Sequence, residues 1–181
     1  MKRVLSFAVV CSLAAVPAFA QGGAASDNPL TQGGRGAYEG VKGYLTKAAE
    51  QVPESLYGFK ATPDVRSLGQ LFAHVADANF MICGAAAGEK ASGGDIEKTK
   101  TTKADIGAGL AASFAYCDKV WAATTDASAA TMVKMPFGPS MPRLSALSFN
   151  TSHDFEHYGN VITYMRLNKM VPPSSQGQGM R

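Results

Sequence analysis

The chain has 181 residues, 46% of them hydrophobic and 17% charged, which is enough for one domain with a buried core. The formal net charge of +3 falls to +1 without the first twenty residues, because these contain Lys2 and Arg3 but no acid. No block of Lys or Arg with interleaved aromatic residues remains, so we expect no nucleic-acid partner.

The first twenty residues are typical of a secretory signal peptide. A basic start, "MKR", precedes the apolar run "VLSFAVVCSLAAVPAFA", which ends in the small-x-small pattern Ala18-Phe19-Ala20. The run is short for a membrane span and no second one follows. We therefore expect cleavage after Ala20, no membrane span afterwards, and a periplasmic or secreted protein. A lipoprotein anchored at Cys11 is the weaker alternative, because "AVVC" is a poor lipobox.

Residues 21–34, "QGGAASDNPLTQGG", are small, polar and rich in glycine, and we expect a flexible leader. Over residues 36–51 apolar side chains recur at helical spacing, which predicts a first helix that Pro53 ends. The connection "PESLYGFKATPDVR" should be extended, because Pro63 disfavours a helical conformation at the residue before it.

A second helix should begin directly after Ser67, because Ser67 and Gln70 match a capping box. It runs through "LGQLFAHVADANFMICGAAAG" and should end at Gly84 or Gly88. The segment "EKASGGDIEKTK" alternates charges with small residues and is interpreted as a solvated loop. Thr102 is the expected N-cap of a third helix, residues 103–124.

The segment "TMVKMPFGPSMPR" predicts a short hairpin or an irregular loop. Pro142 suits the first turn of a fourth helix, residues 143–168. The ending "MVPPSSQGQGMR" stops this helix, and residues 173–181 should form a flexible tail. Four amphipathic helices without a sustained strand pattern predict an all-α four-helix bundle over residues 35–172.

The chain has three histidines, and two of them, His153 and His157, are four residues apart in the fourth helix. Helical geometry separates them by about 40° around the axis and about 6 Å along it. Two ligands of one metal ion have this spacing. The third, His74, lies among apolar neighbours in the second helix and should face inward. A core histidine with one hydrogen bond is the alternative for His74.

Other polar residues belong to the same face of the fourth helix. Asn150, Asn160 and Tyr164 lie within about 40° of the histidine stripe. They would orient a substrate or water, or else form hydrogen bonds between helices. Asp154 and Glu156 flank the stripe by about 80° and should be rim residues.

Two further residues of the second helix bear on this site. Asp77, one turn after His74, is either a partner that fixes the tautomer of a ligating imidazole or a solvent-facing charge. Cys83 is about 180° around the helix from His74, so it should not be a ligand. In an oxidising compartment Cys83 could pair with Cys117, which the sequence leaves open.

Three imidazoles leave the remaining metal positions to water or substrate, which is typical of an open, catalytic site. One divalent transition metal (Zn, Ni, Fe or Mn) is the expected cofactor, and histidine spacing does not choose between these metals. Such an ion would activate water or a thiol.

The motifs "RSLGQLFAHVADAN", "PESLYGFKATPDVRS" and "HDFEHYGNVITYMRLNKMVPPSS" together resemble the DinB-like (DinB/YfiT) superfamily, over roughly residues 36–175. The resemblance implies a four-helix bundle, a three-histidine site for a divalent metal at His74, His153 and His157, and a possible homodimer. Relatives include thiol-dependent S-transferases and a mycothiol-dependent isomerase. A secretion signal departs from the cytosolic members that use thiols.

We therefore expect an exported metal-dependent enzyme that acts on an unknown small molecule, as a hydrolase or as a thiol-dependent transferase. The alternatives are a non-catalytic metal-binding bundle and a helical interaction module without metal.

Overall fold

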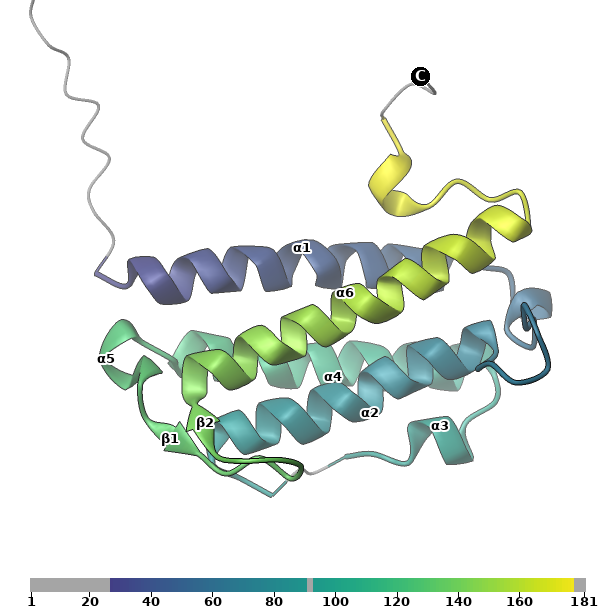
Figure 1. The fold of residues 1–181 in the computed structure, drawn as a ribbon. Coiled ribbons are helices and arrows are strands. Elements are labelled where there is room, and N and C mark those ends of the chain that lie inside the picture. Colours follow the sequence, from purple (N-terminus) through teal and green to yellow (C-terminus); the bar gives the residue numbers. More distant parts are fainter. Residues whose placement is uncertain (1–26, 91–92, 178–181) are drawn as a thin grey trace, which may run out of the picture.

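A computed structural model describes residues 27–90 and 93–177. Four long helices lie side by side in a bundle (Figure 1). They are α1 (Pro29–Gln51), α2 (Leu68–Ala87), α4 (Lys103–Ala123) and α6 (Arg143–Leu167). The predicted all-α four-helix fold is therefore confirmed. The predicted signal peptide lies outside the described residues. None of the helices in the described ranges combines the length and hydropathy needed to cross a bilayer.

Helix α1 begins at Pro29, so residues 29–34 are helical and not part of a flexible leader as expected. Proline suits the first turn, where a helix has no use for its amide hydrogen. The next two amides, of Leu30 and Thr31, donate to the carboxylate of Asp126 at 3.0 and 2.8 Å. Asp126 opens the short helix α5 (Asp126–Ala129), so this cap comes from a residue distant in the sequence.

Helices α2 and α4 begin where their caps predict. The Ser67 hydroxyl accepts from the amide of Gln70, and the Gln70 side chain accepts from the amide of Ser67 at 2.9 Å, which completes the capping box. Thr102 caps α4 in a similar way. Gly88 directly follows α2 with a φ of 79°, a left-handed conformation that glycine adopts without steric cost.

The connections contain more structure than predicted. The loop between α2 and α4, expected to be fully solvated, includes the short helix α3 (Ile96–Thr99). Strands β1 (Met132–Val133) and β2 (Met141–Pro142) pair antiparallel, which confirms a short hairpin before α6. A 3₁₀ turn, η1 (Glu54–Leu56), follows α1.

The end of the chain also departs from the expectation of a flexible tail from residue 173 onward. Residues Pro173–Ser175 form the 3₁₀ turn η2. The amide of Ser174 donates to the hydroxyl of Tyr158 at 2.9 Å, and Pro173 is buried. Residues 173–176 therefore pack back onto the bundle.

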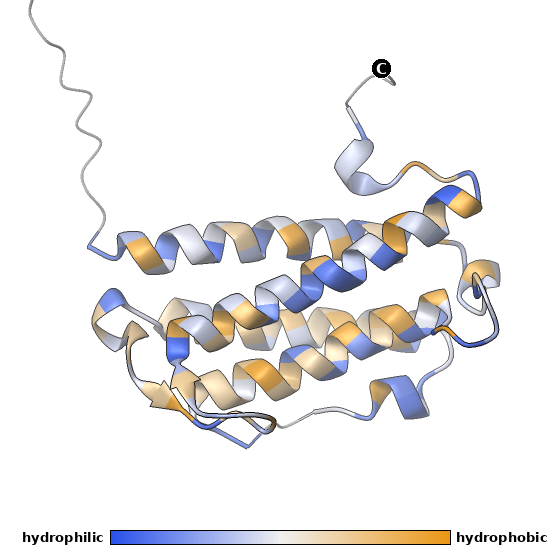
Figure 2. Ribbon diagram, viewed as in Figure 1, coloured by the Kyte–Doolittle hydropathy of each residue, from blue (hydrophilic) through white to orange (hydrophobic). Residues whose placement is uncertain are grey.

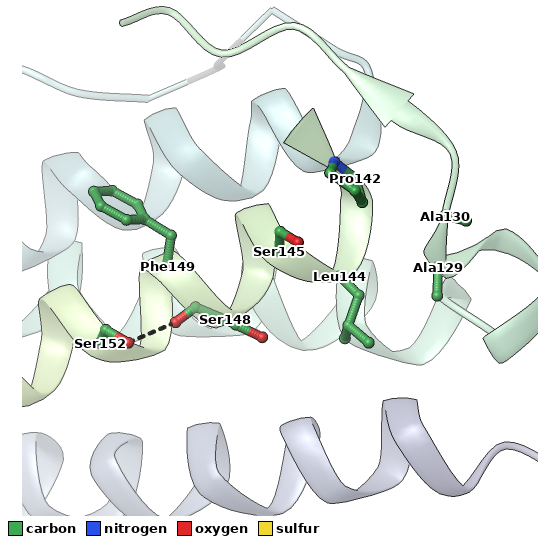
Figure 3. Close-up of a pocket in the computed structure, with 8 residues that line it drawn as sticks. All are labelled: Ala129, Ala130, Pro142, Leu144, Ser145, Ser148, Phe149 and Ser152. Atoms are coloured by element: carbon green, nitrogen blue, oxygen red, sulfur yellow. Dashed lines mark hydrogen bonds between the residues drawn. The ribbon is translucent and has the colours of Figure 1, made fainter. Parts of the chain in front are cut away.

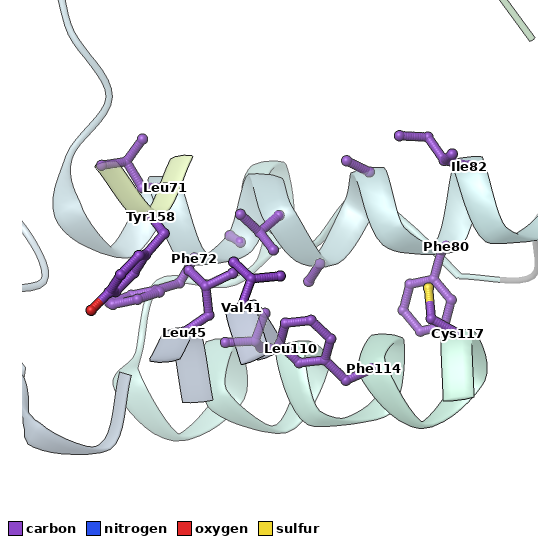
Figure 4. Packing of buried hydrophobic residues seen from close by; sticks show 14 of the residues in the cluster. Val41, Leu45, Leu71, Phe72, Phe80, Ile82, Leu110, Phe114, Cys117 and Tyr158 are labelled. Carbon is purple, nitrogen blue, oxygen red and sulfur yellow. The ribbon is translucent and has the colours of Figure 1, made fainter. Parts of the chain in front are cut away.

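The apolar faces of the four helices meet along the axis of the bundle. Buried side chains from α1, α2 and α4 interdigitate there, among them Val41, Leu45, Phe72 and Phe114 (Figure 4). The middle of α6, by contrast, is hydrophilic (Figure 2). This polar stretch carries two of the three histidines.

Cys83 of α2 and Cys117 of α4 form a disulfide, with their Cα atoms 5.4 Å apart. The question that the sequence left open is thereby answered. Both residues are fully buried, so the bond joins the two helices inside the core.

Two glycine positions should respond to alanine in opposite ways. A Cβ on Gly69 would lie 3.0 Å from the carbonyl oxygen of Tyr57, a backbone atom that cannot move aside cheaply. We expect Gly69→Ala to destabilise the fold by about 1–3 kcal/mol. Gly40, on the exposed face of α1, has open space around it, and Gly40→Ala should stabilise by about 0.5–1 kcal/mol. Urea unfolding of both variants checks this pair, and equal effects would contradict it.

Candidate metal centre

Two of the three histidines project from successive turns of α6. The Nε2 atoms of His153 and His157 are 3.1 Å apart, and their ring centroids are 4.4 Å apart. Both residues lie inside the regular helix, which places side chains four residues apart on one face. His157 is buried and His153 is half-buried. The pair therefore directs two imidazole nitrogens at one point.

The third histidine reaches the same point from α2. The ring centroid of His74 lies 4.7 Å from that of His157 and 5.2 Å from that of His153. One ring nitrogen from each of the three residues falls within 4.8 Å of the others. The structure thus brings together the three residues that the sequence singled out as metal ligands.

The histidines of α6 are held neutral. The pKa of His153 is lowered to about 4. Burial is the largest cause, and the smaller causes are His157, His74 and the charge of Arg66. Burial and then His74 also lower the pKa of His157. Both rings are therefore uncharged at neutral pH, which is the state in which an imidazole can bind a metal.

This arrangement suits a divalent cation. Two facing imidazole lone pairs repel each other unless a proton or a cation lies between them. The Nδ1 atoms of His153 and His157 are buried without a hydrogen-bond partner among the described residues, so both rings rely on Nε2 for polar contacts. Nitrogen donors of this kind suit Zn, Ni or Fe, and a bound ion would satisfy all three rings at once.

Glu97 is a site residue that the sequence did not indicate, and so is Arg66 beside it. Glu97 lies on α3, and its Oε2 is 3.1 Å from Nδ1 of His74. Its Oε1 accepts from Nε of Arg66 at 2.8 Å. Because Glu97 belongs to a loop interpreted as solvated, and no spacing rule links it to His74 across 23 residues, no sequence signal could have found it.

Asp77 does not play the predicted role. Its carboxylate makes no hydrogen bond to His74; instead it accepts from the amides of Ile96 and Glu97 at 2.9 and 3.0 Å. Asp77 thereby anchors the start of α3 to α2. Asp77 is linked to His74 through Glu97, whose amide donates to Asp77 and whose carboxylate contacts His74.

Asn150 and Asp154 form a buried polar cluster beside the histidines. Asn150 donates to Oδ1 of Asn79 at 2.8 Å, which is the inter-helix hydrogen bond that was the alternative to a substrate role. Asp154, predicted at the rim, is fully buried instead. The prediction failed because α6 packs against α2 and α1 in the bundle. Burial raises the pKa of Asp154 well above its usual range.

We expect Asp154→Asn to stabilise the protein, by more at high pH than at low pH. With its pKa raised, folded Asp154 retains a proton that the unfolded chain releases above about pH 4, so stability is lost as the pH rises. Each pH unit between the unfolded and folded pKa values costs the wild type about 1.4 kcal/mol, which the variant does not lose. Urea unfolding between about pH 4 and pH 8 measures the gain; a gain independent of pH would contradict this reasoning.

A polar pocket of about 560 Å³ lies against the triad and reaches it at His157. Asn160 is exposed and lines this pocket, as does Glu156, which was predicted at the rim. Tyr164 also lines it, and its hydroxyl donates to the backbone oxygen of Arg66 at 3.0 Å. Asn160 and Tyr164, predicted to orient a substrate, thus both face the open space beside His157.

A second hollow of about 570 Å³ lies over the N-terminal half of α6 (Figure 3). Its lining is small or apolar, with Leu144 and Phe149 beside three serines. Ser152 donates to the backbone oxygen of Ser148 at 3.0 Å. No titratable side chain lines this hollow, so we do not assign chemistry to it.

Several solved structures share the fold. A DinB-like protein from Bacillus cereus superposes with a TM-score of 0.68 at 19% identity, covering 78% of this chain and 95% of that one. A DinB-like protein from Bacillus subtilis gives 0.61 at 15% identity, with 80% and 94% covered. A mycothiol-dependent maleylpyruvate isomerase gives 0.60 at 14% identity, with 72% of this chain and 60% of the isomerase covered.

At these identities the structural similarity shows the fold alone. No curated protein sequence matches the chain. The sequence does match the DinB superfamily over residues 37–161, which is more than half of its length. The chain therefore belongs to the DinB superfamily.

Proposed function

We propose that the protein binds one divalent transition metal (Zn, Ni, Fe or Mn) through His74, His153 and His157 and acts with it on a small molecule. The observation that carries the proposal is the convergence of three imidazoles from two helices beside a polar pocket. Two reaction classes fit this site: hydrolysis, and transfer that involves a thiol cosubstrate. A non-catalytic metal-binding bundle is the alternative.

A bound ion supplies Lewis acidity, which favours the deprotonated form of water or a thiol and polarises a carbonyl group. Three protein ligands leave room for such a group. The chain itself supplies the binding contacts. Asn160 offers both a donor and an acceptor to the pocket. The hydroxyl hydrogen of Tyr164 is committed to the Arg66 carbonyl, so Tyr164 contributes its oxygen as an acceptor.

We also propose that the protein is exported. The signal-like first twenty residues support this, and so does the Cys83–Cys117 disulfide, because such bonds persist in oxidising compartments. An oxidising compartment favours the hydrolase over the thiol-dependent transferase, because free thiols are oxidised there. In the cell of origin, the N-terminal sequence of the protein from an extracytoplasmic fraction should begin at Gln21; a protein that retains Met1 would contradict export.

The test of function uses untagged protein loaded in turn with Zn, Ni, Fe and Mn. Each form is assayed against ester and amide substrates, and against an electrophile in the presence of a low-molecular-weight thiol. We expect turnover of one substrate class. This turnover should require metal and should be lost in His157→Ala, whereas Tyr164→Phe should lower it less. Metal uptake without turnover would favour the non-catalytic bundle. If the protein takes up none of the four metals, the remaining alternative is a helical interaction module without metal.

A further inference from the structure

We infer that Glu97 is a positioning residue for the metal: by accepting a hydrogen bond from Nδ1 of His74, it directs the Nε2 lone pair of His74 at His153 and His157. The inference rests on the proposed metal site and assigns it a residue outside the histidine triad. The carboxylate would act through His74 and not touch the ion itself.

The Glu97 carboxylate is held on both of its oxygens. Oε2 meets Nδ1 of His74 at 3.1 Å, and Oε1 accepts from Nε of Arg66 at 2.8 Å. About a quarter of the Glu97 side chain is exposed, so the contact is partly shielded from water. A glutamate carboxylate can only accept hydrogen bonds, so Glu97 is the acceptor in both contacts.

The backbone that carries Glu97 is also fixed. Asp77 accepts from the amides of Ile96 and Glu97, and Asp77 lies three residues after His74 on the same face of α2. Ile96 is buried against α4, where a Cβ on Gly109 would come within 2.8 Å of its side chain. Helix α2 thus carries both His74 and Asp77, which holds the backbone of Glu97 in place. The packing of α3 on α2 therefore maintains the contact between Glu97 and His74.

The chemical reason for such a partner is the tautomer. A neutral imidazole carries its proton on either Nδ1 or Nε2, and a metal binds only the nitrogen without the proton. A carboxylate at Nδ1 favours the proton there and leaves Nε2 as the donor atom. His153 and His157 have no partner at Nδ1 in the described structure. Glu97 therefore supplies the orienting contact that the other two rings lack.

The experiment compares four untagged full-length proteins: wild type, Glu97→Leu, Glu97→Gln and the control Glu39→Gln. Glu39 carries the same charge but lies on α1, where its carboxylate accepts from Nε of Arg35. The dissociation constant for Zn²⁺ is measured by competition with a chromophoric chelator. In the metal-free proteins at about pH 8, where histidine is uncharged, ¹⁵N spectra of the imidazole nitrogens report the tautomer of His74.

We expect Glu97→Leu to weaken Zn²⁺ binding by about 10–100-fold, the range for losing such a partner. Glu97→Gln should lose less, because the amide oxygen still accepts from Nδ1. Glu39→Gln should change affinity by no more than about threefold, because the charge that it removes is exposed and lies on another helix. Wild-type His74 should carry its proton on Nδ1, and Glu97→Leu should shift it toward Nε2. Circular dichroism should show equal helix content in all four.

Two results would overturn the inference: a wild-type His74 protonated on Nε2, or Zn²⁺ binding by Glu97→Leu as tight as that of wild type. A failure of the proposed metal site gives a different result from a failure of the role of Glu97. If wild type takes up no Zn²⁺, the metal site is wrong, while the tautomer of His74 still decides whether Glu97 orients it. Asp77→Ala provides a further check, because a residue that acts through Glu97 should add little further loss in the Asp77→Ala/Glu97→Leu double variant.

Discussion

Replacing both His153 and His157 with alanine should abolish metal binding while the bundle still folds. Wild-type protein should hold about one equivalent of a divalent transition metal, as expected for a three-imidazole site, and the variant none. The two rings share one point, with their Nε2 atoms 3.1 Å apart, so their loss leaves His74 as a single ligand. Elemental analysis after loading with Zn, Ni, Fe and Mn measures the outcome.

The control for this variant lies on the same helix. Ser148 and Ser152 are also four residues apart on α6 and are exposed. The Ser148→Ala/Ser152→Ala variant should retain the full metal content, which separates loss of ligands from general disturbance of α6. A histidine variant that binds as much metal as wild type would refute the proposed site. A variant that loses its helical circular dichroism would show that the rings are needed for folding, and the single variants would then be compared.

Reduction of the Cys83–Cys117 disulfide should lower the free energy of unfolding by about 3–4 kcal/mol. The two cysteines are 34 residues apart, and a cross-link of that span removes about this much chain entropy from the unfolded state. The bond lies in the core between α2 and α4, so a reductant reaches it through unfolding or local opening. Urea unfolding of fully oxidised and fully reduced protein gives the difference in free energy.

The Cys83→Ala/Cys117→Ala variant is the control for this measurement. Its unfolding should not respond to reductant, and its stability should resemble that of the reduced wild type. We expect metal content to be preserved in it, because Cys83 is nine residues from His74 and points to the opposite side of α2. Equal unfolding curves for the oxidised and reduced protein, with both thiols titrated as free, would contradict the expected contribution.

Local signals in the sequence were sufficient for the helices. The Ser67 and Thr102 caps place the starts of α2 and α4 at the predicted residues, because a cap needs only side chains and amides three residues apart. The start of α1 was missed for the converse reason. Its first amides are capped by Asp126, a residue 95 positions away from Thr31.

The sequence by itself determined the all-α class, the bounds of three long helices and the His153/His157 pair on one helix face, because helical periodicity and capping act over a few residues. His74 joined this pair as a candidate through its apolar neighbours and the family resemblance. Only the tertiary structure decided which groups meet across helices. It paired Cys83 with Cys117, buried Asp154, and brought Glu97 from a loop to His74. Burial and hydrogen-bond partners depend on how distant segments pack, and the spacing of residues along one helix carries no information about that packing.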